Sequence, residues 1–265
     1  MSKQKNESIK CSKCNTTFNI VRWESINTYE TPELKEVLFS GYLWKYQCPS
    51  CGNSIDINTA LLYHNPEKRY MIQYEPSNRT YLEMKSRSLE ICEEWEMTSP
   101  EMFEFLISNK YILRLVKTQS DLKEKIRIFD LGLNDIAVEA IKLSLHFSLA
   151  QGDNFPVKLV FYDIVNNNGL ILFTFHYDDF INTESITIPV GDAYQITVDA
   201  LNSVEIKDRE HSMKYVDIYY ADELMSQYRK KEAKKELIEN KYCPVCKKNV
   251  SPTFHGLCPD CDSPL

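Results

Sequence analysis

Four Cys-x-x-Cys pairs contain eight of the nine cysteines, and their spacing constrains the fold more than any other feature of the sequence. Two residues between cysteines let both sulfurs of a tight turn reach one ion, and two such turns complete a tetrahedral zinc site. The pairs Cys243/Cys246 and Cys258/Cys261 are separated by eleven residues. A ribbon of about 25 residues cannot fold on its own apolar surface, so the metal must supply much of its folding free energy. The sequence therefore predicts a small zinc ribbon at residues 241–265.

A second set of pairs, Cys11/Cys14 and Cys48/Cys51, lies near the N-terminus, with 33 residues between the two pairs. That interval is long enough for a strand, a helix and a strand, so this zinc site is predicted to be built into a larger domain. One zinc ion shared between pairs from opposite ends is physically possible, but completion of each site by neighbouring pairs is simpler. We therefore expect two zinc ions per chain.

The ligand type indicates what the metal does. Catalytic zinc usually has three protein ligands and an open coordination position, whereas four cysteines close the site. A redox role for a Cys-x-x-Cys pair would require a thioredoxin-like βαβ context, which the sequence lacks. Both zinc ions are therefore predicted to be structural, and no catalytic or cofactor-binding residue is assigned.

Charge and composition narrow the classes of function. The net charge of −7 does not favour non-specific nucleic-acid binding over the whole surface. The stretch from Arg229 to Lys248 differs, because eight basic and three acidic residues give it 8 − 3 = +5. The polar N-terminus does not resemble a signal peptide, and no apolar run approaches the ~18 residues that span a bilayer. We expect a soluble, cytoplasmic protein without membrane contact, in which paired cysteines bind metal instead of forming disulfides.

The pattern of apolar residues predicts an α+β protein with an N-terminal zinc-ribbon-containing domain with helices, a central antiparallel sheet and a small C-terminal zinc ribbon. Strands are predicted at 18–23, 42–47, 54–57, 69–74 and 111–116. Helices are predicted at 31–41, 78–96, 120–131 and 135–149, with a short one beginning at 99. The turn residues of 166–169 predict a hairpin of strands 157–163 and 170–175, which strand 185–190 and an extended segment at 194–198 would widen.

The last predicted element is a long helix over 213–241 that leads to the final cysteines. The expected domains are 1–152 with the first zinc module, 153–240 with the antiparallel β region and the long helix, and 241–265 with the C-terminal ribbon.

The N-terminal half carries an ordered series of motifs. In chain order these are CSKC, VRWESIN, TPELKEVLFSG, YQCPSCG and LLYHNPEKRYMIQY, and further on LRLVKTQSDLKEKIRIFDLGLNDIAVEAIK. This series closely resembles the CpXC family, named for its Cys-Pro-x-Cys motif and found in bacteria and archaea, over roughly the first 150 residues. Ser12 departs from the commoner proline of the first pair, which does not affect ligation. The resemblance implies an architecture and bound zinc, and it implies no reaction.

Other residues were weighed as functional candidates. His64 lies in a turn-like segment after the first metal module and is the first candidate for a catalytic group, although a structural histidine is favoured. Cys92 is expected to be a small buried hydrophobe. The aromatic residues beside the first module are expected to belong to the core and not to stack on nucleic-acid bases: Trp23, Trp44, Tyr42 and Tyr46. His146 and His176 are expected to be packing or surface residues, and His255 could donate a hydrogen bond to a cysteine sulfur. The acidic groups are expected to lie on solvated faces: Glu93, Glu94, Glu96, Asp178 and Asp179.

These observations favour a non-enzymatic, zinc-stabilised interaction or regulatory protein with a protein partner. The first alternative is an enzyme with a site between the helical and β regions. The second is a nucleic-acid-binding zinc-ribbon protein that uses the basic stretch from Arg229 to Lys248.

Overall fold

The computed structural model describes residues 1–149, 159–167, 170–177, 185–204, 212–239, 241–250, 257–261 and 263–264, and the fold is α+β, as predicted. The first elements are β1 (Lys3–Lys10), β2 (Thr17–Asn27), α1 (Leu34–Ser40), the 3-10 helix η1 (Tyr42–Trp44), β3 (Lys45–Gln47), β4 (Ser54–Asp56), β5 (Leu61–Asn65) and β6 (Tyr70–Tyr74). The next are α2 (Tyr81–Thr98), α3 (Pro100–Ser108), β7 (Ile112–Val116), α4 (Gln119–Asp130) and α5 (Asp135–Leu149). The last are β8 (Leu159–Asn167), β9 (Leu170–Tyr177), β10 (Ser185–Pro189), α6 (Ala193–Asn202), β11 (Lys214–Tyr215), α7 (Ile218–Glu239), β12 (Lys241–Cys243) and β13 (Lys248–Val250).

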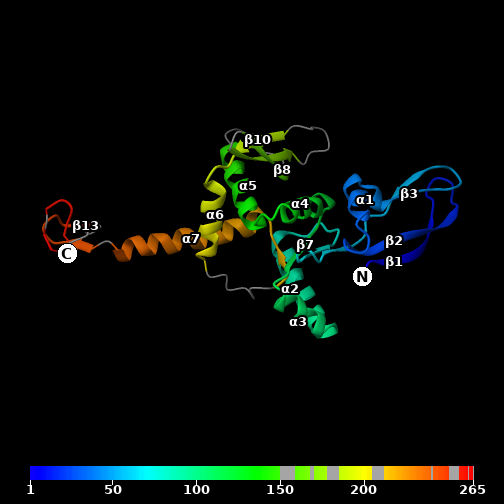
Figure 1. Cartoon of the computed structure of the whole chain (residues 1–265), viewed down its shortest axis with the longest axis horizontal. Helices are drawn as coiled ribbons and strands as arrows, with labels where there is room; N and C mark the ends of the chain where they lie inside the picture. Colours follow the sequence, from blue (N-terminus) through cyan, green and yellow to red (C-terminus); the bar gives the residue numbers. More distant parts are fainter. Residues whose placement is uncertain are drawn as a thin grey trace.

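A mixed sheet with the strand order β1-β2-β5-β6-β7-β11 forms the centre of the molecule. Its neighbours pair antiparallel at β1–β2 and β5–β6, and parallel at β2–β5, β6–β7 and β7–β11. The middle strands are rich in buried aromatic and aliphatic residues, as expected for strands covered on both faces. β1 and β2 form a long hairpin that extends to one end of the molecule, and β13 lies near the other end (Figure 1).

Strand β11 joins a late part of the chain to the N-terminal half. Lys214 pairs with Arg114 and Tyr215 with Leu115 in a parallel register. Just before it, Met213 is fully buried among residues of β7, α2 and α3. The segment that leads into α7 is therefore fixed at the edge of the central sheet. The predicted long helix begins at Ile218, five residues later than expected, because Lys214 and Tyr215 are in the sheet.

The second sheet is antiparallel, with the order β10-β9-β8, and its hairpin and third strand confirm the predicted β region. Residues 168 and 169 of the predicted turn lie outside the described residues. The extended segment predicted at 194–198 is wrong, because these residues belong to helix α6. Leu201 and Val204, at the end of this helix and just after it, pack in one cluster with Ile136 of α5 and Tyr220 of α7 instead of extending the sheet.

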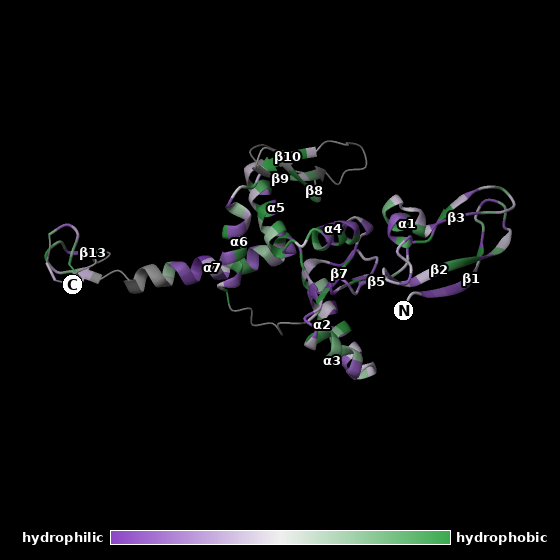
Figure 2. Ribbon diagram, in the orientation of Figure 1, coloured by the Kyte–Doolittle hydropathy of each residue, from purple (hydrophilic) through white to green (hydrophobic). Residues whose placement is uncertain are grey.

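The main core is continuous across the predicted boundary at residue 152. It contains residues of the central sheet, of α4 and α5, and of the antiparallel sheet, among them Tyr63, Tyr70, Ile126, Val138, Phe161, Phe173 and Phe175. The three phenylalanine rings contact one another with centroids 5.3 to 6.3 Å apart. Figure 2 shows apolar residues concentrated where α5 meets β8–β10 and hydrophilic residues along α7 beyond its contact with α6. Among the described residues, no helix combines the length and the apolar composition needed to cross a bilayer.

The strand predicted at 42–47 is partly wrong. Its first half is the 3-10 helix η1, and only Lys45–Gln47 form a strand. Trp44 is buried in the main core and donates its indole N–H to the Thr59 carbonyl at 3.2 Å, and Leu43 is buried beside it. Two consecutive buried side chains do not fit the alternation of a one-sided strand, so the local packing overrides the β propensity.

Strand β1 was not predicted, because its sequence KQKNESIK is polar and lacks β-branched runs. It is an edge strand that pairs along its whole length with β2. Its polar and basic side chains suit an exposed edge, where they discourage pairing with another chain.

Six charged side chains are buried together between the central sheet and two helices, and we call them the ion cluster. Its members are Arg114 of β7, Glu124 and Lys125 of α4, and Asp135, Glu139 and Lys142 of α5. Arg114 donates from Nε and Nη2 to the two oxygens of Asp135 at 2.7 and 2.8 Å, and Lys125 Nζ lies 3.2 Å from the same carboxylate. Burial alone would raise the pKa of Asp135, but the two cations hold it below its ordinary value.

The other half of the ion cluster continues this alternation of charge. Lys125 Nζ donates to Glu139 at 3.0 Å, and Lys142 Nζ lies 3.0 Å from the second Glu139 oxygen. Lys142 also donates to Glu124 Oε1 at 2.8 Å, and the same oxygen accepts the backbone N–H of Phe161 at 2.6 Å. Three cations and three anions are thus matched, and one of the carboxylates connects α4 to strand β8.

The central pair of the ion cluster gives a stability prediction. Asp135→Asn removes the carboxylate charge that pairs with Arg114 and Lys125 and leaves an uncompensated positive charge in the interior. The free energy of unfolding should therefore fall by about 3–5 kcal/mol. Asp192→Asn is the matched control, because Asp192 is exposed and its side chain caps no helix. The control should change stability by less than about 0.5 kcal/mol. Urea unfolding at neutral pH measures both, and equal stability of the two variants would contradict the role given to the ion cluster.

Candidate metal centres

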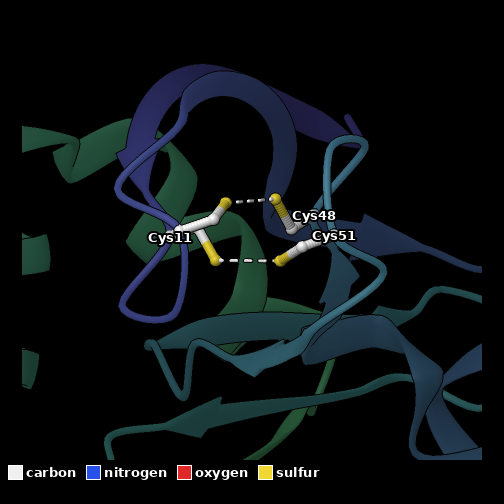
Figure 3. A group of neighbouring side chains, drawn as sticks. Cys11, Cys48 and Cys51 are labelled. Carbon is white, nitrogen blue, oxygen red and sulfur yellow. Dashed lines mark hydrogen bonds between the residues drawn. The ribbon is translucent and has the colours of Figure 1, made fainter.

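The first cysteine cluster forms where two hairpin turns face each other. Cys11 and Cys14 lie in the turn between β1 and β2, and Cys48 and Cys51 lie between β3 and β4. The sulfurs of Cys11 and Cys51 are 3.7 Å apart, and those of Cys14 and Cys48 are 3.6 Å apart (Figure 3). All four sulfurs lie within 4.8 Å of one another.

The second cluster has the same arrangement at the C-terminal end. Its sulfurs are 3.5 Å apart for Cys243 and Cys261 and 3.8 Å apart for Cys246 and Cys258. Cys243 precedes the turn between β12 and β13, and Val250 is the only other buried residue of the small core around these sulfurs among the described residues. Each cluster is completed by two pairs from its own end of the chain.

The backbone explains why these short turns direct two sulfurs to one point. In the first cluster, Asn15 N–H donates to the Cys11 carbonyl at 3.0 Å, and Gly52 N–H donates to the Cys48 carbonyl at 2.9 Å. The residue after the second cysteine has a positive φ in three of the turns: 58° at Asn15, 67° at Gly52 and 54° at Lys247. Glycine and asparagine adopt this conformation most readily, so these residues help to close the turns.

One sulfur of each cluster lies beside a hydroxyl group. Cys14 Sγ is 3.2 Å from Thr16 Oγ1, and Cys261 Sγ is 3.2 Å from Ser263 Oγ. The hydrogen bond with Thr16 or Ser263 lowers the pKa of each cysteine to about 6. Such a contact favours the thiolate, which is the form that binds metal. Neither hydroxyl was predicted, although a Ser or Thr two residues after the last cysteine of a pair is visible in the sequence.

The sulfurs also oppose one another's ionisation. The contact with Cys261, together with burial and the other two sulfurs, raises the pKa of Cys246 to about 12. Four thiolates this close repel strongly, so full ionisation requires a cation among them. The donor set, four sulfurs in a closed cage, is one that a soft divalent ion such as zinc fits.

The structure places His64 away from both clusters. It lies on β5, half-buried, with Nε2 3.3 Å from the hydroxyl of Tyr111, and burial lowers its pKa. Three cavities of about 420, 890 and 480 Å³ are lined by described residues, and His64 borders none of these three. The structure therefore gives no support to His64 as a catalytic group.

The other candidates are mostly structural. Cys92 is buried as predicted, and its sulfur accepts the backbone N–H of Met213 at 2.8 Å. Glu93, Glu94 and Glu96 are exposed on α2, where Glu94 pairs with Arg87 at 2.8 Å. Of the aromatic residues, Trp44 is core and Trp23 packs against it, while Tyr42 is exposed. The side chains of His176, Asp178, Asp179 and His255 lie outside the described ones.

The basic stretch is described only in part. Arg229 pairs with Asp222 at 3.3 Å, and Lys231 Nζ donates to the Ser203 carbonyl, so both already have partners on the protein. Lys248 pairs with Asp260 at 2.8 Å. Side chains 234–241 lie outside the described ones. Three of the eight basic groups are therefore engaged locally.

Comparison with known proteins identifies the N-terminal half. The family described as CpXC protein matches residues 9–142, which cover the first cysteine cluster, the strands β2 to β7, and α4 with most of α5. No curated protein and no solved structure matches the chain. The second cluster, at residues 243–261, lies beyond the matched region. Because the match spans half of the sequence and includes the predicted motifs, the chain belongs to the CpXC family.

Proposed function

We propose that each cysteine cluster binds one zinc ion and that the protein is a non-enzymatic interaction protein whose two zinc modules hold binding surfaces in shape. The sulfur geometry carries the first part. A tetrahedron with Zn–S bonds of about 2.3 Å has edges of about 3.8 Å. Two sulfur–sulfur contacts in each cluster measure 3.5 to 3.8 Å, close to this edge and far from a disulfide bond.

A structural role for zinc follows from the ligand count. Four sulfur ligands leave no open position at which a substrate or water could bind. The thiolates of Cys14 and Cys261 would be oriented by their neighbouring hydroxyls, as ligands of structural sites commonly are. Zinc bound here would supply folding free energy to turns that have little apolar surface of their own.

The interaction role is supported by what the C-terminal ribbon exposes. Tyr242 is 60% and Val245 63% exposed, on a module with a minimal core. Apolar and aromatic side chains on a small rigid module are typical of a protein-binding surface. On the same module Lys248 pairs with Asp260 at 2.8 Å, which reduces its attraction for a phosphate backbone. We therefore favour a protein partner over a nucleic acid.

The partner can be tested by site-specific photo-crosslinking in the source cells. A crosslinker in place of Val245 should give a discrete adduct that survives nuclease treatment, because the partner is a protein. Ile196, 65% exposed on α6, is the matched control position and should give none. If the adducts disappear with nuclease, the partner is a nucleic acid and the alternative function is favoured. Equal adducts from both positions would contradict the assigned surface.

The metal content is a direct prediction. Purified protein should contain two zinc ions per chain, one for each four-cysteine group. Titration with a thiol reagent should detect the eight paired cysteines only after denaturation with a chelator, because bound thiolates are protected. Elemental analysis would distinguish zinc from iron, the other common ion of four-sulfur sites. Paired thiols that react at once in the native protein would contradict the proposal and favour a redox role.

The two zinc sites should differ in their effect on stability. Cys11→Ser opens the site beside β2, whose other end pairs with β5 in the central sheet, so the main thermal transition should move to lower temperature. Cys258→Ser opens a site whose small core contains Val250 and the cysteines, so mainly residues 241–264 should lose order. Thermal melts and NMR signal dispersion measure the two effects. Equal lowering of the main transition by both variants would rule out this division.

A further inference from the structure

A cavity of about 420 Å³ lies beside the ion cluster, remote in sequence from both cysteine clusters. Its wall comes from the end of β7, the first turns of α4, the middle of α5, and the segment from Tyr215 to Tyr219 that joins β11 to α7. This volume is within the range of sites for small molecules.

The position of the cavity is the first argument for a ligand. β6, β7 and β11 run parallel, and the cavity opens at the carboxyl ends of β7 and β11, where helices α4 and α7 begin. In open sheets with parallel strands, ligands bind outside the carboxyl ends of the strands. β11 is essential to this geometry, because it brings residues 215–219 to the same edge as Val116 and Lys117.

The floor of the cavity is polar but balanced. Glu124, Lys125, Glu139 and Lys142 line it, and all four side chains are more than nine-tenths buried. Each lysine contacts two carboxylates of the ion cluster, so the positive charges are already matched. Glu124 Oε1 accepts from Lys142 Nζ at 2.8 Å and from the backbone N–H of Phe161 at 2.6 Å. The four charged groups of the floor are therefore paired with one another, and a preference for the charge of a ligand must come from the rim.

The rim of the cavity carries acidic groups. Of the described wall residues outside the ion cluster, Lys117 is basic, Asp121 and Asp217 are acidic, and His146 is titratable. Lys117 Nζ donates to the Arg79 carbonyl at 2.9 Å and lies 5.8 Å from the centre of the Tyr215 ring. Asp217 forms no ion pair with any described residue. It is therefore the group of the rim that favours a cation in the cavity.

Asp217 is held at this rim by the fold. Its Oδ1 accepts the N–H groups of Tyr219 at 3.0 Å and Tyr220 at 3.2 Å, so it caps α7. Burial raises its pKa to about 6, so the carboxylate is ionised at neutral pH at a cost in free energy. A cation bound beside the carboxylate would stabilise its ionised form and offset that free energy. Tyr219 is also in the wall, and phenol rings attract organic cations, whereas the Tyr215 ring already has Lys117 Nζ 5.8 Å from its centre.

We propose that this cavity binds a small organic cation, an ammonium group on an apolar body, with Asp217 as its counter-ion. An anion fits less well, although two helix N-termini meet here. The N-terminus of α4 is already capped by Thr118, whose hydroxyl accepts the Asp121 N–H at 3.0 Å, and that of α7 is capped by the Asp217 carboxylate. The apolar body would contact Val116, Leu159 and Ile218 in the wall.

Three probes of one shape test the charge preference. Benzylamine, benzyl alcohol and benzoate are titrated into the full-length, zinc-loaded protein at pH 7.5 in about 150 mM salt, which screens non-specific surface attraction. Isothermal titration calorimetry gives the affinity, and amide chemical shifts give the location. Benzylamine should bind about tenfold or more tightly than the other two probes, with its largest shifts at residues 215–219. Preference for benzoate, no binding of any probe, or shifts centred elsewhere would overturn the proposal.

The key variant is Asp217→Asn, which removes the charge and keeps an oxygen that can cap α7. It should weaken benzylamine binding about tenfold or more and should not lower the melting temperature, since a partly buried charge is removed. Asp222→Asn is the matched control, one turn further along α7, exposed and outside the cavity wall, and it should bind as the unchanged protein does. Equal binding by the two variants would refute the role of Asp217. The inference does not depend on the proposed interaction role or on metal content.

Discussion

The buried alternation of charge in the ion cluster is the interaction on which most of the central fold depends. Arg114 belongs to the sheet, Lys125 to α4 and Glu139 to α5, and Glu124 reaches the backbone of β8. Each ion would be costly to bury alone, so the elements that carry them can pack only in the one arrangement that pairs all six. The apolar core on one side and the cavity on the other are both defined by this arrangement.

The features that the sequence predicted well are those set by neighbouring residues. Zinc-ligand spacing, the helical periodicity of α4 and α5, and the hairpin of β8 and β9 all depend on contacts within a few residues or across a short turn. The helix at 194–198 and the turn at Tyr42–Trp44 were missed because tertiary packing overrides β-branched and aromatic propensity there. The parallel pairing of Lys214 with Arg114 joins residues 214 − 114 = 100 positions apart, and no local sequence pattern predicts it.

The cavity was also invisible in the sequence, for a related reason. Charged residues are almost never fully buried unless they are paired, so Glu124, Lys125, Glu139 and Lys142 would ordinarily be placed on the solvent faces of their helices. Their spacing, adjacent on α4 and three apart on α5, gives a hint only when the two helices are known to meet. The sequence suggested an alternative site between the helical and β regions, but it named His64, which lies elsewhere.

The cost of ionising Asp217 links the cavity to the stability of the fold. A helix can be capped equally well by asparagine, which carries no charge and would avoid the free energy of burying a carboxylate. The aspartate therefore lowers stability at neutral pH without an advantage in capping, and residues of this kind are typical of binding sites, where function opposes stability. A carboxylate of this kind in the wall of a cavity is better explained by a cationic ligand than by the requirements of folding.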